Sequence, residues 1–423
     1  MIDTRTLEEA DPKLADMIAR EADRQRSKIH LIASENFASL AMMQAAGSVL
    51  ANNYSEGYPG RRYYEGCQVV DEIETLAIER AKALFGADHA NVQPHSGSQA
   101  NMAAYLAVIE PGDTILGMAL DQGGHLTHGS HVNFSGNLFN VVAYGMDPET
   151  ELIDFEEVRR LAVEHQPKMI IGGYSSYSRL LDWSKFRDIA DEVGAILVID
   201  AAHVIGLIAG GAHPNPVPHA DIVTATTHKA LRGPRGGLIL CKEKYAKAID
   251  KAVFPYVQGG ANNSMIAAKA LCFEQAGSED FATYAHQIVK NAAALANNMA
   301  AQGARIISGG TDNHMFMIDL RSIDEKLTGK VAAKLLDDVG ITLNRNAIPF
   351  DPRSPFITSG LRIGLPSATT AGMDEASMET LGDLMIGVLR GRDDEAAVAG
   401  FASRIAELAA RFPSYPEGFS GHA

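Results

Sequence analysis

The sequence predicts an α/β fold in which a mainly parallel sheet is covered by helices on both faces. Between residues 70 and 240, short apolar segments such as DTILGMAL and KMIIGGYSS alternate with amphipathic segments such as WSKFRDIADEVG. Apolar strands that alternate with helices are typical of parallel sheets buried on both sides. With 423 residues, 46% of them hydrophobic, the chain is long enough for a large core and a second unit.

The elements are expected in a simple order. The segment DPKLADMIAREADRQRSKI has helical spacing, with Leu14, Met17 and Ile18 on one face. VVDEIETLAIERAKALF is a predicted helix, and AILVIDAAH, DIVTATTH and GGLILCK are predicted strands. A long helical stretch follows over residues 265–302, before strands near RIISGG and MFMIDL and a helix near MDEASMETLGDLMIGVL. We therefore expect an N-terminal helical arm over residues 1–30, a large domain over 31–280 and a smaller C-terminal α/β domain over 281–423.

Charge and cysteine usage narrow the possible classes of protein. The formal net charge is -15 and no long basic block occurs, so neither a nucleic acid nor an anionic membrane is an expected partner. The start of the chain lacks the order of a signal peptide, and no run of about 20 apolar residues indicates a membrane span. Cys67, Cys241 and Cys272 are odd in number and far apart, which does not indicate a disulfide framework and favours the cytoplasm.

Two residues at successive strand ends suggest cofactor chemistry. Asp200 ends the apolar segment AILVID, and Lys229 follows the next predicted strand in TATTHKALRGPRGG. A lysine amine can form an imine with an aldehyde, and a carboxylate can keep a pyridine nitrogen protonated, so this pair suits pyridoxal phosphate. Taken singly, Asp200 is as well explained as a loop cap, and Lys229 as a solvated surface lysine.

Two other segments allow a phosphate site and a metal site to be weighed. In NVQPHSGSQAN, the residues 96–98 precede a helical stretch, where backbone amides and hydroxyls suit a phosphate; an ordinary helix cap explains them equally simply. His125 and His128 in GGHLTHGSH have the spacing of metal ligands. No cysteine or carboxylate accompanies them, so we expect no metal. His125 is better interpreted as a ring that stacks on a cofactor, or as a loop histidine bonded to the backbone.

Two further features suit an amino-acid substrate. Arg362 lies in the strand-like TSGLRIG, where a guanidinium can bind a carboxylate through two hydrogen bonds. The segment NNYSEGYPGRRYYEG gathers Glu56 and several tyrosines around a glycine-rich turn, an arrangement that could serve acid–base chemistry on a hydroxyl. A packed aromatic loop is the alternative explanation for this segment.

Together these motifs resemble the serine hydroxymethyltransferase family of fold-type-I pyridoxal-phosphate enzymes. The segments LIASEN, NYSEGYPGRRYY, NVQPHSGSQAN, GGHLTHGS, TTHKALRGPRGG, SGGTDNH and SPFITSGLRIG match the family in order over most of the chain. The resemblance implies that pyridoxal phosphate is the cofactor and that tetrahydrofolate accepts the one-carbon unit of serine. It also implies a homodimer or homotetramer.

The resemblance implies a role for each matching residue. Lys229 would hold the cofactor, Asp200 would pair with its ring nitrogen, and His125 would stack on its ring. Glu56, Tyr64 and the pair Gly259 and Gly260 would come from the partner subunit. The full set comprises catalytic Lys229, Glu56, Asp200, His228 and Tyr64; cofactor-binding Tyr54, Ser96, Gly97, Ser98, His125, Ser175, His203, Gly259 and Gly260; substrate-binding Ser34 and Arg362; and folate-binding Leu120, Gly124 and Asn346.

The chain departs from the family's pattern at several positions. These are Glu65, Asp121, Gln122, Ala201, Ile205, Ala225, Ala230, Tyr256, Ala261, Asn262, Asn263 and Ser264. Most are expected beside the cofactor or on the subunit-crossing loop, with Ala201 making room near the ring. We therefore expect the substrate to be serine or an α-substituted serine such as 2-methylserine, which would give alanine. A folate-independent aldolase ranks lower, and a non-catalytic binding protein of the same fold is the alternative from another class.

Overall fold

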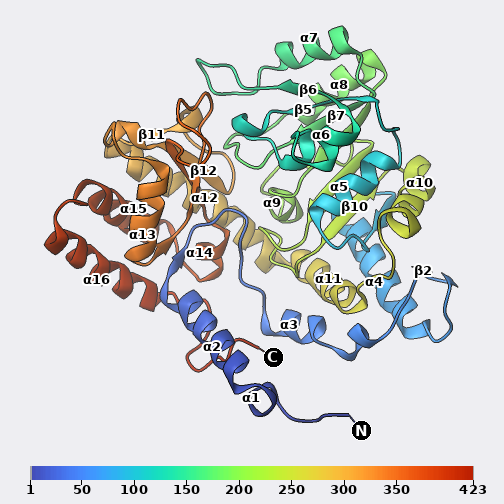
Figure 1. The fold of residues 1–423 in the computed structure, drawn as a ribbon, viewed down its shortest axis with the longest axis horizontal. Helices are drawn as coiled ribbons and strands as arrows, with labels where there is room; N and C mark the ends of the chain where they lie inside the picture. Colours follow the sequence, from blue (N-terminus) through green and yellow to red (C-terminus); the bar gives the residue numbers. More distant parts are fainter. Residues whose placement is uncertain (1, 423) are drawn as a thin grey trace.

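The computed structural model describes residues 2–422, and a seven-stranded sheet forms its largest element (Figure 1). The strands β9, β8, β7, β5 and β6 run parallel, whereas β10 is antiparallel to both of its neighbours. The mainly parallel sheet is therefore confirmed. In spatial order the strands are β4 (His89–Asn91), β10 (Gly237–Cys241), β9 (Ile222–Thr226), β8 (Ile196–Asp200), β7 (Met169–Gly173), β5 (Thr114–Met118) and β6 (Asn140–Tyr144).

Helices cover both faces of this sheet. Side chains along a strand alternate between faces, and the central strand β8 is apolar on both. Val198 packs in one core with α5 (Gly97–Leu106) and α10 (Ala246–Lys251). Leu197 and Ile199 pack in the opposite core, to which α4 (Gln68–Phe85), α7 (Phe155–His165) and α8 (Trp183–Val193) contribute. An unbroken apolar strand, as the sequence indicates, is what two buried faces require.

A smaller antiparallel sheet forms from the C-terminal part of the chain. Its spatial order is β11 (Arg305–Ile306), β12 (Met315–Asp319), β15 (Gly360–Gly364) and β14 (Asn344–Asn346). The N-terminal strand β1 (Ile29–His30) pairs in parallel with β13 (Ile341–Thr342), so the start of the chain is tied to this part. The accompanying helices are α12 (Glu279–Ala301), α13 (Gly329–Asp338), α14 (Pro366–Thr370), α15 (Glu375–Arg390) and α16 (Glu395–Arg411).

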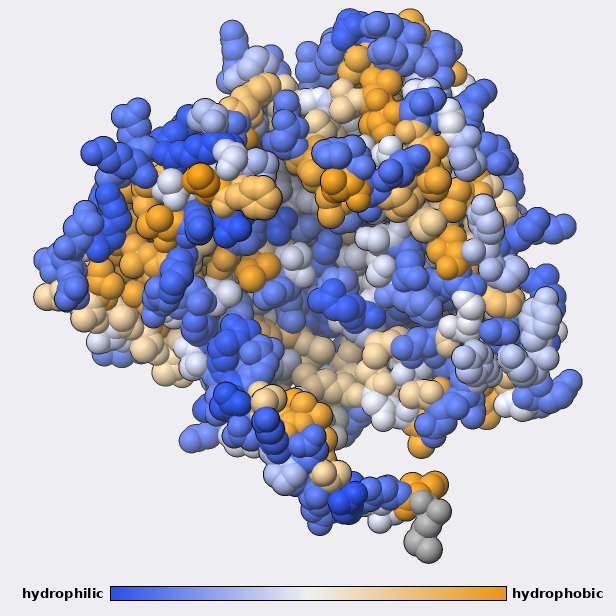
Figure 2. Space-filling view, in the orientation of Figure 1, coloured by the Kyte–Doolittle hydropathy of each residue, from blue (hydrophilic) through white to orange (hydrophobic). Residues whose placement is uncertain are grey.

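Two predicted helices differ in detail from the structure. The stretch 265–302 is two helices, α11 (Asn263–Ala276) and α12, because the chain breaks at Gly277 and the Ser278 hydroxyl accepts from the Phe281 N–H to start a new helix. The arm contains α1 (Leu7–Ala10) and α2 (Pro12–Ser27), but Leu14 and Met17 are exposed. Figure 2 shows hydrophobic side chains on this arm, which projects from the body. The other elements are α3 (Leu40–Ala46), β2 (Gly57–Tyr58), β3 (Arg61–Arg62), α6 (Phe134–Leu138) and α9 (Ile205–Ala209).

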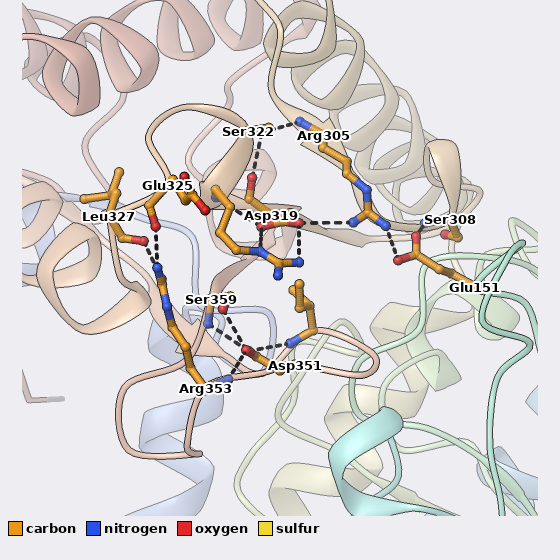
Figure 3. Close-up of polar contacts among 12 residues, drawn as sticks. Glu151, Arg305, Ser308, Asp319, Ser322, Glu325, Leu327, Asp351, Arg353 and Ser359 are labelled. Carbon is orange, nitrogen blue, oxygen red and sulfur yellow. Dashed lines mark hydrogen bonds and ion pairs between the residues drawn. The ribbon is translucent and has the colours of Figure 1, made fainter.

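A polar clamp joins the small sheet to loops of the large one (Figure 3). Glu151 precedes α7 and is 8% exposed; it accepts from Arg305 and from the backbone N–H of Ser308, the latter at 2.7 Å. Arg179 donates to the Ser308 carbonyl and to Asp312. Ser308 has a φ of 57°, so this turn is held in the left-handed region between two charged partners. The clamp sets where the small sheet lies against the large one.

Within residues 2–422, no helix combines the length and apolar character needed to cross a membrane. In the same range, no group of three or more His, Cys, Asp or Glu side chains is arranged to hold a metal ion.

Candidate active site

A cavity of about 400 Å³ lies where β7, β8 and β9 end. Ligand sites of open α/β sheets lie at such carboxyl ends. Figure 2 shows a hollow between the two parts of the molecule, with both hydrophilic and hydrophobic residues along its rim. The cavity is lined by Ser34, Glu35, Ser96, Gly97, Ser98, Asn101, His125, Tyr174, Ser175, Asp200, Ala202, His203, Thr226, His228, Lys229, Arg235 and Arg362. The structure thus gathers in one cavity predicted residues that lie more than 300 positions apart in the chain.

Lys229 lies in the turn after β9 and is 9% exposed. Burial lowers the pKa of its amine to about 8, although the charge of Asp200 opposes this shift. The Lys229 carbonyl accepts from the Arg232 N–H at 2.9 Å and from Asn36 at 3.0 Å, so the turn is fixed at its backbone. Gly233 must be glycine here because an added Cβ would lie 2.4 Å from Cys272 Sγ. The lysine is therefore a buried amine with lowered basicity, not a solvated surface residue.

Asp200 ends β8 and is kept ionised by its neighbours. Its Oδ2 accepts from Asn101 Nδ2 at 2.8 Å and from His128 Nε2 at 3.1 Å, and its Oδ1 accepts from the Ala202 N–H at 3.0 Å. Burial opposes ionisation, but the hydrogen bonds from His128 and Asn101 hold the pKa of the carboxyl well below its usual value. The carboxylate faces the cavity as a fixed negative charge.

Asn101 and His128 are functional neighbours that the sequence did not single out for this role. His128 Nδ1 accepts from the His125 N–H at 3.2 Å, which leaves Nε2 to carry the proton donated to Asp200. The spacing of the two histidines in HLTH is therefore explained by these hydrogen bonds and not by metal binding. His125 lines the cavity, its Nδ1 lies 2.7 Å from Thr127 Oγ1, and burial lowers its pKa to about 4, so its ring is neutral at pH 7.

The turn at residues 96–98 forms the start of α5. Ser96 is the N-cap residue, and its hydroxyl accepts from the Gln99 N–H at 3.2 Å. The N–H groups of Gly97 and Ser98 have no hydrogen-bond partner within residues 2–422. A Cβ on Gly97 would lie 2.6 Å from Thr226 Cγ2, so the approach of α5 to β9 requires glycine. Free amides and hydroxyls at a helix N-terminus form an anion site.

Arg362 enters the cavity from β15 of the small sheet. Its Nη1 donates to the Ser175 carbonyl at 2.8 Å and its Nε to Asn344 Oδ1 at 3.2 Å, which leaves Nη2 for a ligand. Burial lowers the pKa of the guanidinium to about 10, so it is charged at pH 7. His228 and Ser34 also line the cavity, and Ser34 comes from the segment that follows β1. Burial lowers the pKa of His228 to about 3.

A second group of predicted residues does not line the cavity of its own chain. The Tyr54 and Tyr64 rings meet edge to face with their centroids 6.1 Å apart, and both side chains are at least half exposed. A Cβ on Gly260 would lie 2.9 Å from the Tyr54 ring, and one on Gly259 would lie 3.7 Å from Glu56 Oε1. The charge of Glu56 raises the pKa of the Tyr64 phenol. These five residues form one cluster, exposed or half-buried, outside the cavity of their own chain.

The three predicted folate residues lie beside the cavity without lining it. Leu120 is 49% exposed, and the loop that it begins contacts the cavity because the Ser175 N–H donates to the Gly123 carbonyl at 2.7 Å. Gly124 packs so closely that a Cβ would lie 2.0 Å from the Met118 carbonyl. Asn346 ends β14 and lies 3.5 Å from Ser176 Oγ.

Among the positions that depart from the family's pattern, Ala201 does not lie where it was expected, in the space beside the cofactor ring. None of these positions lines the cavity, and Ala201 is fully buried in the core behind it. The reason is the turn after β8, where Asp200 and Ala202 face the cavity and Ala201 packs against the sheet. Ala225 and Ala230 are also buried away from the cavity. The cavity of this chain therefore consists of residues that match the family's pattern.

A comparison with protein families agrees with the resemblance in the sequence motifs. The family model described as serine hydroxymethyltransferase matches residues 7–385. The matched range contains the whole large sheet, the whole small sheet and every residue that lines the cavity.

Proposed function

Because the chain belongs to the serine hydroxymethyltransferase family and is a fold-type-I, pyridoxal-phosphate-dependent transferase of one-carbon metabolism, we propose that it moves the hydroxymethyl group of a serine-type amino acid to tetrahydrofolate. One observation carries this proposal. The buried amine of Lys229, the ionised Asp200 and the guanidinium of Arg362 all face a single cavity.

The cavity offers a partner for each polar group of pyridoxal phosphate. An amine suits its aldehyde, a buried carboxylate suits its ring nitrogen, and the free amides at residues 97–98 suit its phosphate. When bound, the cofactor supplies an electron sink for negative charge at the amino acid's Cα. Lys229, Asp200 and Ser98 are thus proposed to hold it, with His125 beside its ring.

The protein's own residues then position the amino acid and control protons. Arg362 binds the carboxylate through Nη2 while its bond to Ser175 keeps the guanidinium from turning. Asp200 keeps a proton on the ring nitrogen because Asn101 and His128 stabilise its negative charge. Restraining both ends of the substrate fixes which bond to Cα is broken, and this orientation is the main contribution of the cavity.

We further propose that the enzyme acts at least as a homodimer. The exposed cluster of Glu56, Tyr54, Tyr64, Gly259 and Gly260 would enter the partner subunit's cavity, where Glu56 and Tyr64 serve the hydroxymethyl group. In a symmetric dimer the same contact completes both cavities. Leu120, Gly124 and Asn346, beside the Ser175–Ser176 loop, are proposed to contact tetrahydrofolate.

Serine is the first candidate donor, because none of the family's changed positions lines the cavity of this chain. 2-Methylserine is the second candidate, because Tyr256, 66% exposed, lies in the changed segment next to Gly259 and would enter the neighbouring cavity with it. Purified enzyme should be given each amino acid with and without tetrahydrofolate. Product release without folate would identify an aldolase instead of a transferase.

Colour provides an independent check of the enzyme assignment. Cofactor held by Lys229 should make the purified protein yellow, and Lys229→Ala should be colourless. A wild-type protein that stays colourless after addition of pyridoxal phosphate would favour a binding protein without catalysis.

A further inference from the structure

Two histidines form a buried pair at the back of the cavity. His203 lines the cavity and is 4% exposed, whereas His314 lies behind it and is fully buried. Their rings are stacked, with centroids 5.4 Å apart and planes at 28°. His203 Nδ1 and His314 Nε2 are 3.2 Å apart, within hydrogen-bond distance. His314 itself does not line the cavity.

A hydrogen bond between two neutral imidazoles contains one proton. Burial keeps both rings uncharged, since it lowers the pKa of His203 and lowers that of His314 to about 3. Either His314 Nε2 carries the proton and His203 Nδ1 accepts it, or the roles are reversed. In the first arrangement His203 carries its own proton on Nε2. In the second it carries the proton on Nδ1, and Nε2 is left without one.

The outer nitrogen of His314 decides between these arrangements. Its Nδ1 is buried and has no hydrogen-bond partner within residues 2–422. If His203 were the donor, His314 would have to carry its own proton at Nδ1, as a buried N–H without an acceptor. Orphaned buried N–H groups are rare and cost about 1–3 kcal/mol. Nearby positive charges of Arg362 and Lys229 further lower the pKa of His314, so neither arrangement involves a charged His314 ring.

We propose that His314 is a positioning residue that fixes the tautomer of His203, so that His203 presents an Nε2–H donor to the cavity. His203 Nε2 has no hydrogen-bond partner within residues 2–422, so this donor is free for a ligand. If the proposed function is correct, the donor is available to an anionic oxygen on the cofactor ring. His314, the buried histidine of the SGGTDNH segment, thereby has a role although it contacts no ligand itself.

The test reads nitrogen protonation directly. Full-length protein labelled with ¹⁵N-histidine is studied by solid-state NMR, with and without pyridoxal phosphate, and the two residues are assigned from single variants. We expect His203 to show a protonated Nε2 and an unprotonated Nδ1, with more than about a tenfold excess of this tautomer. We also expect the shared proton to be bound to His314 Nε2. A proton on His203 Nδ1 in the wild-type protein would overturn the proposal.

A variant separates the effect of His314 from that of the cofactor. His314→Phe keeps the stacked ring but removes both nitrogens, so the excess of the Nε2–H tautomer in the cofactor-free protein should fall several-fold. His213→Phe is the matched control, because His213 is also buried but packs against Trp183 outside the cavity. An unchanged tautomer ratio in His314→Phe would show that His314 does not fix it. If this variant does not fold, the position of the shared proton in the wild type still decides. The NMR readout does not depend on substrate. The proposal about His314 can therefore fail while the proposed transfer reaction holds, and the transfer reaction can fail while the proposal about His314 holds.

Discussion

Arg362 Nη1 donates to the backbone carbonyl of Ser175, with the two atoms 2.8 Å apart. Arg362 belongs to the small sheet, whereas Ser175 follows β7 of the large sheet. A single hydrogen bond thus connects the proposed carboxylate-binding group to the loop that also lines the cavity. Because the guanidinium is already held at one end, its free end is directed before any substrate arrives.

Replacement of Arg362 should abolish amino-acid binding without loss of colour. Arg362→Ala is expected to weaken amino-acid binding at least about 100-fold, since two charge-assisted hydrogen bonds are lost. Arg362→Lys should recover only part of this, because an ammonium lacks the planar guanidinium that bonds Ser175 and Asn344 while Nη2 stays free for the carboxylate. The measurement is the change in the cofactor's absorbance as amino acid is added. Arg345→Ala on neighbouring β14 is the control, since Arg345 is exposed and does not line the cavity. If amino acid still changed the absorbance of Arg362→Ala as it does in the wild type, Arg362 would not be the carboxylate-binding residue.

The fold was largely predictable because its signals are local. Unbroken apolar strands indicate a sheet buried on both faces, and this holds for β7 and β8. The position of the break at Gly277 was missed because helical periodicity continues on both sides of it. The exposed Leu14 and Met17 show a different limit: periodicity identifies the apolar face of a helix but not whether its own chain covers that face.

The site was predictable where a residue acts through its own chemistry. Lys229, Asp200 and Arg362 were found because an amine and a carboxylate at strand ends, together with a guanidinium on a strand, suggest a ligand. Asn101 and His128 were missed as partners of Asp200, and His314 was not considered, because each acts through another residue. Only the folded geometry brings such partners together. The expectation that Ala201 lies near the cofactor ring failed for the same reason, since the turn after β8 decides which way the Ala201 side chain points.

The lowered basicity of Lys229 predicts how cofactor uptake depends on pH. Only the neutral amine attacks an aldehyde, and a pKa of about 8 means that its fraction rises about tenfold per pH unit below pH 8 and then levels off. We expect the rate at which cofactor-free protein turns yellow to follow this curve. Stopped-flow absorbance after addition of pyridoxal phosphate measures the rate. A solvent-like lysine would instead give a rate that keeps rising to about pH 10, and Lys229→Ala should give no colour at any pH.

The Glu151 clamp should affect both stability and substrate binding. Glu151→Gln removes the charge that Arg305 and the Ser308 N–H share, at a cost of about 1–3 kcal/mol in the free energy of unfolding. Because β12 pairs with β15, a loosened small sheet should also weaken amino-acid binding through Arg362. Urea titration and absorbance titration measure the two effects. Asp338→Asn is the control, since its pair with Lys334 is exposed and worth less than about 0.5 kcal/mol. Equal effects of both variants would refute the clamp.

Mixing two inactive variants tests whether Glu56 acts in the partner subunit's cavity. Lys229→Ala lacks the cofactor anchor, and Glu56→Gln lacks the proposed acid–base group, so each homodimer should be inactive. In a mixed dimer, one cavity combines an intact Lys229 with an intact Glu56 from the other subunit, and the second cavity lacks both. Random exchange of equal amounts makes half of the dimers mixed, so about a quarter of the wild-type activity should return. The measurement is hydroxymethyl transfer after subunits are mixed under mild denaturant and refolded, with each variant refolded alone as the control. If Glu56 instead served its own chain's cavity, every mixed dimer would stay inactive, because no subunit would carry both groups. The exposed cluster of Glu56 with Tyr54 and Gly260, outside the cavity of its own chain, favours recovery of activity.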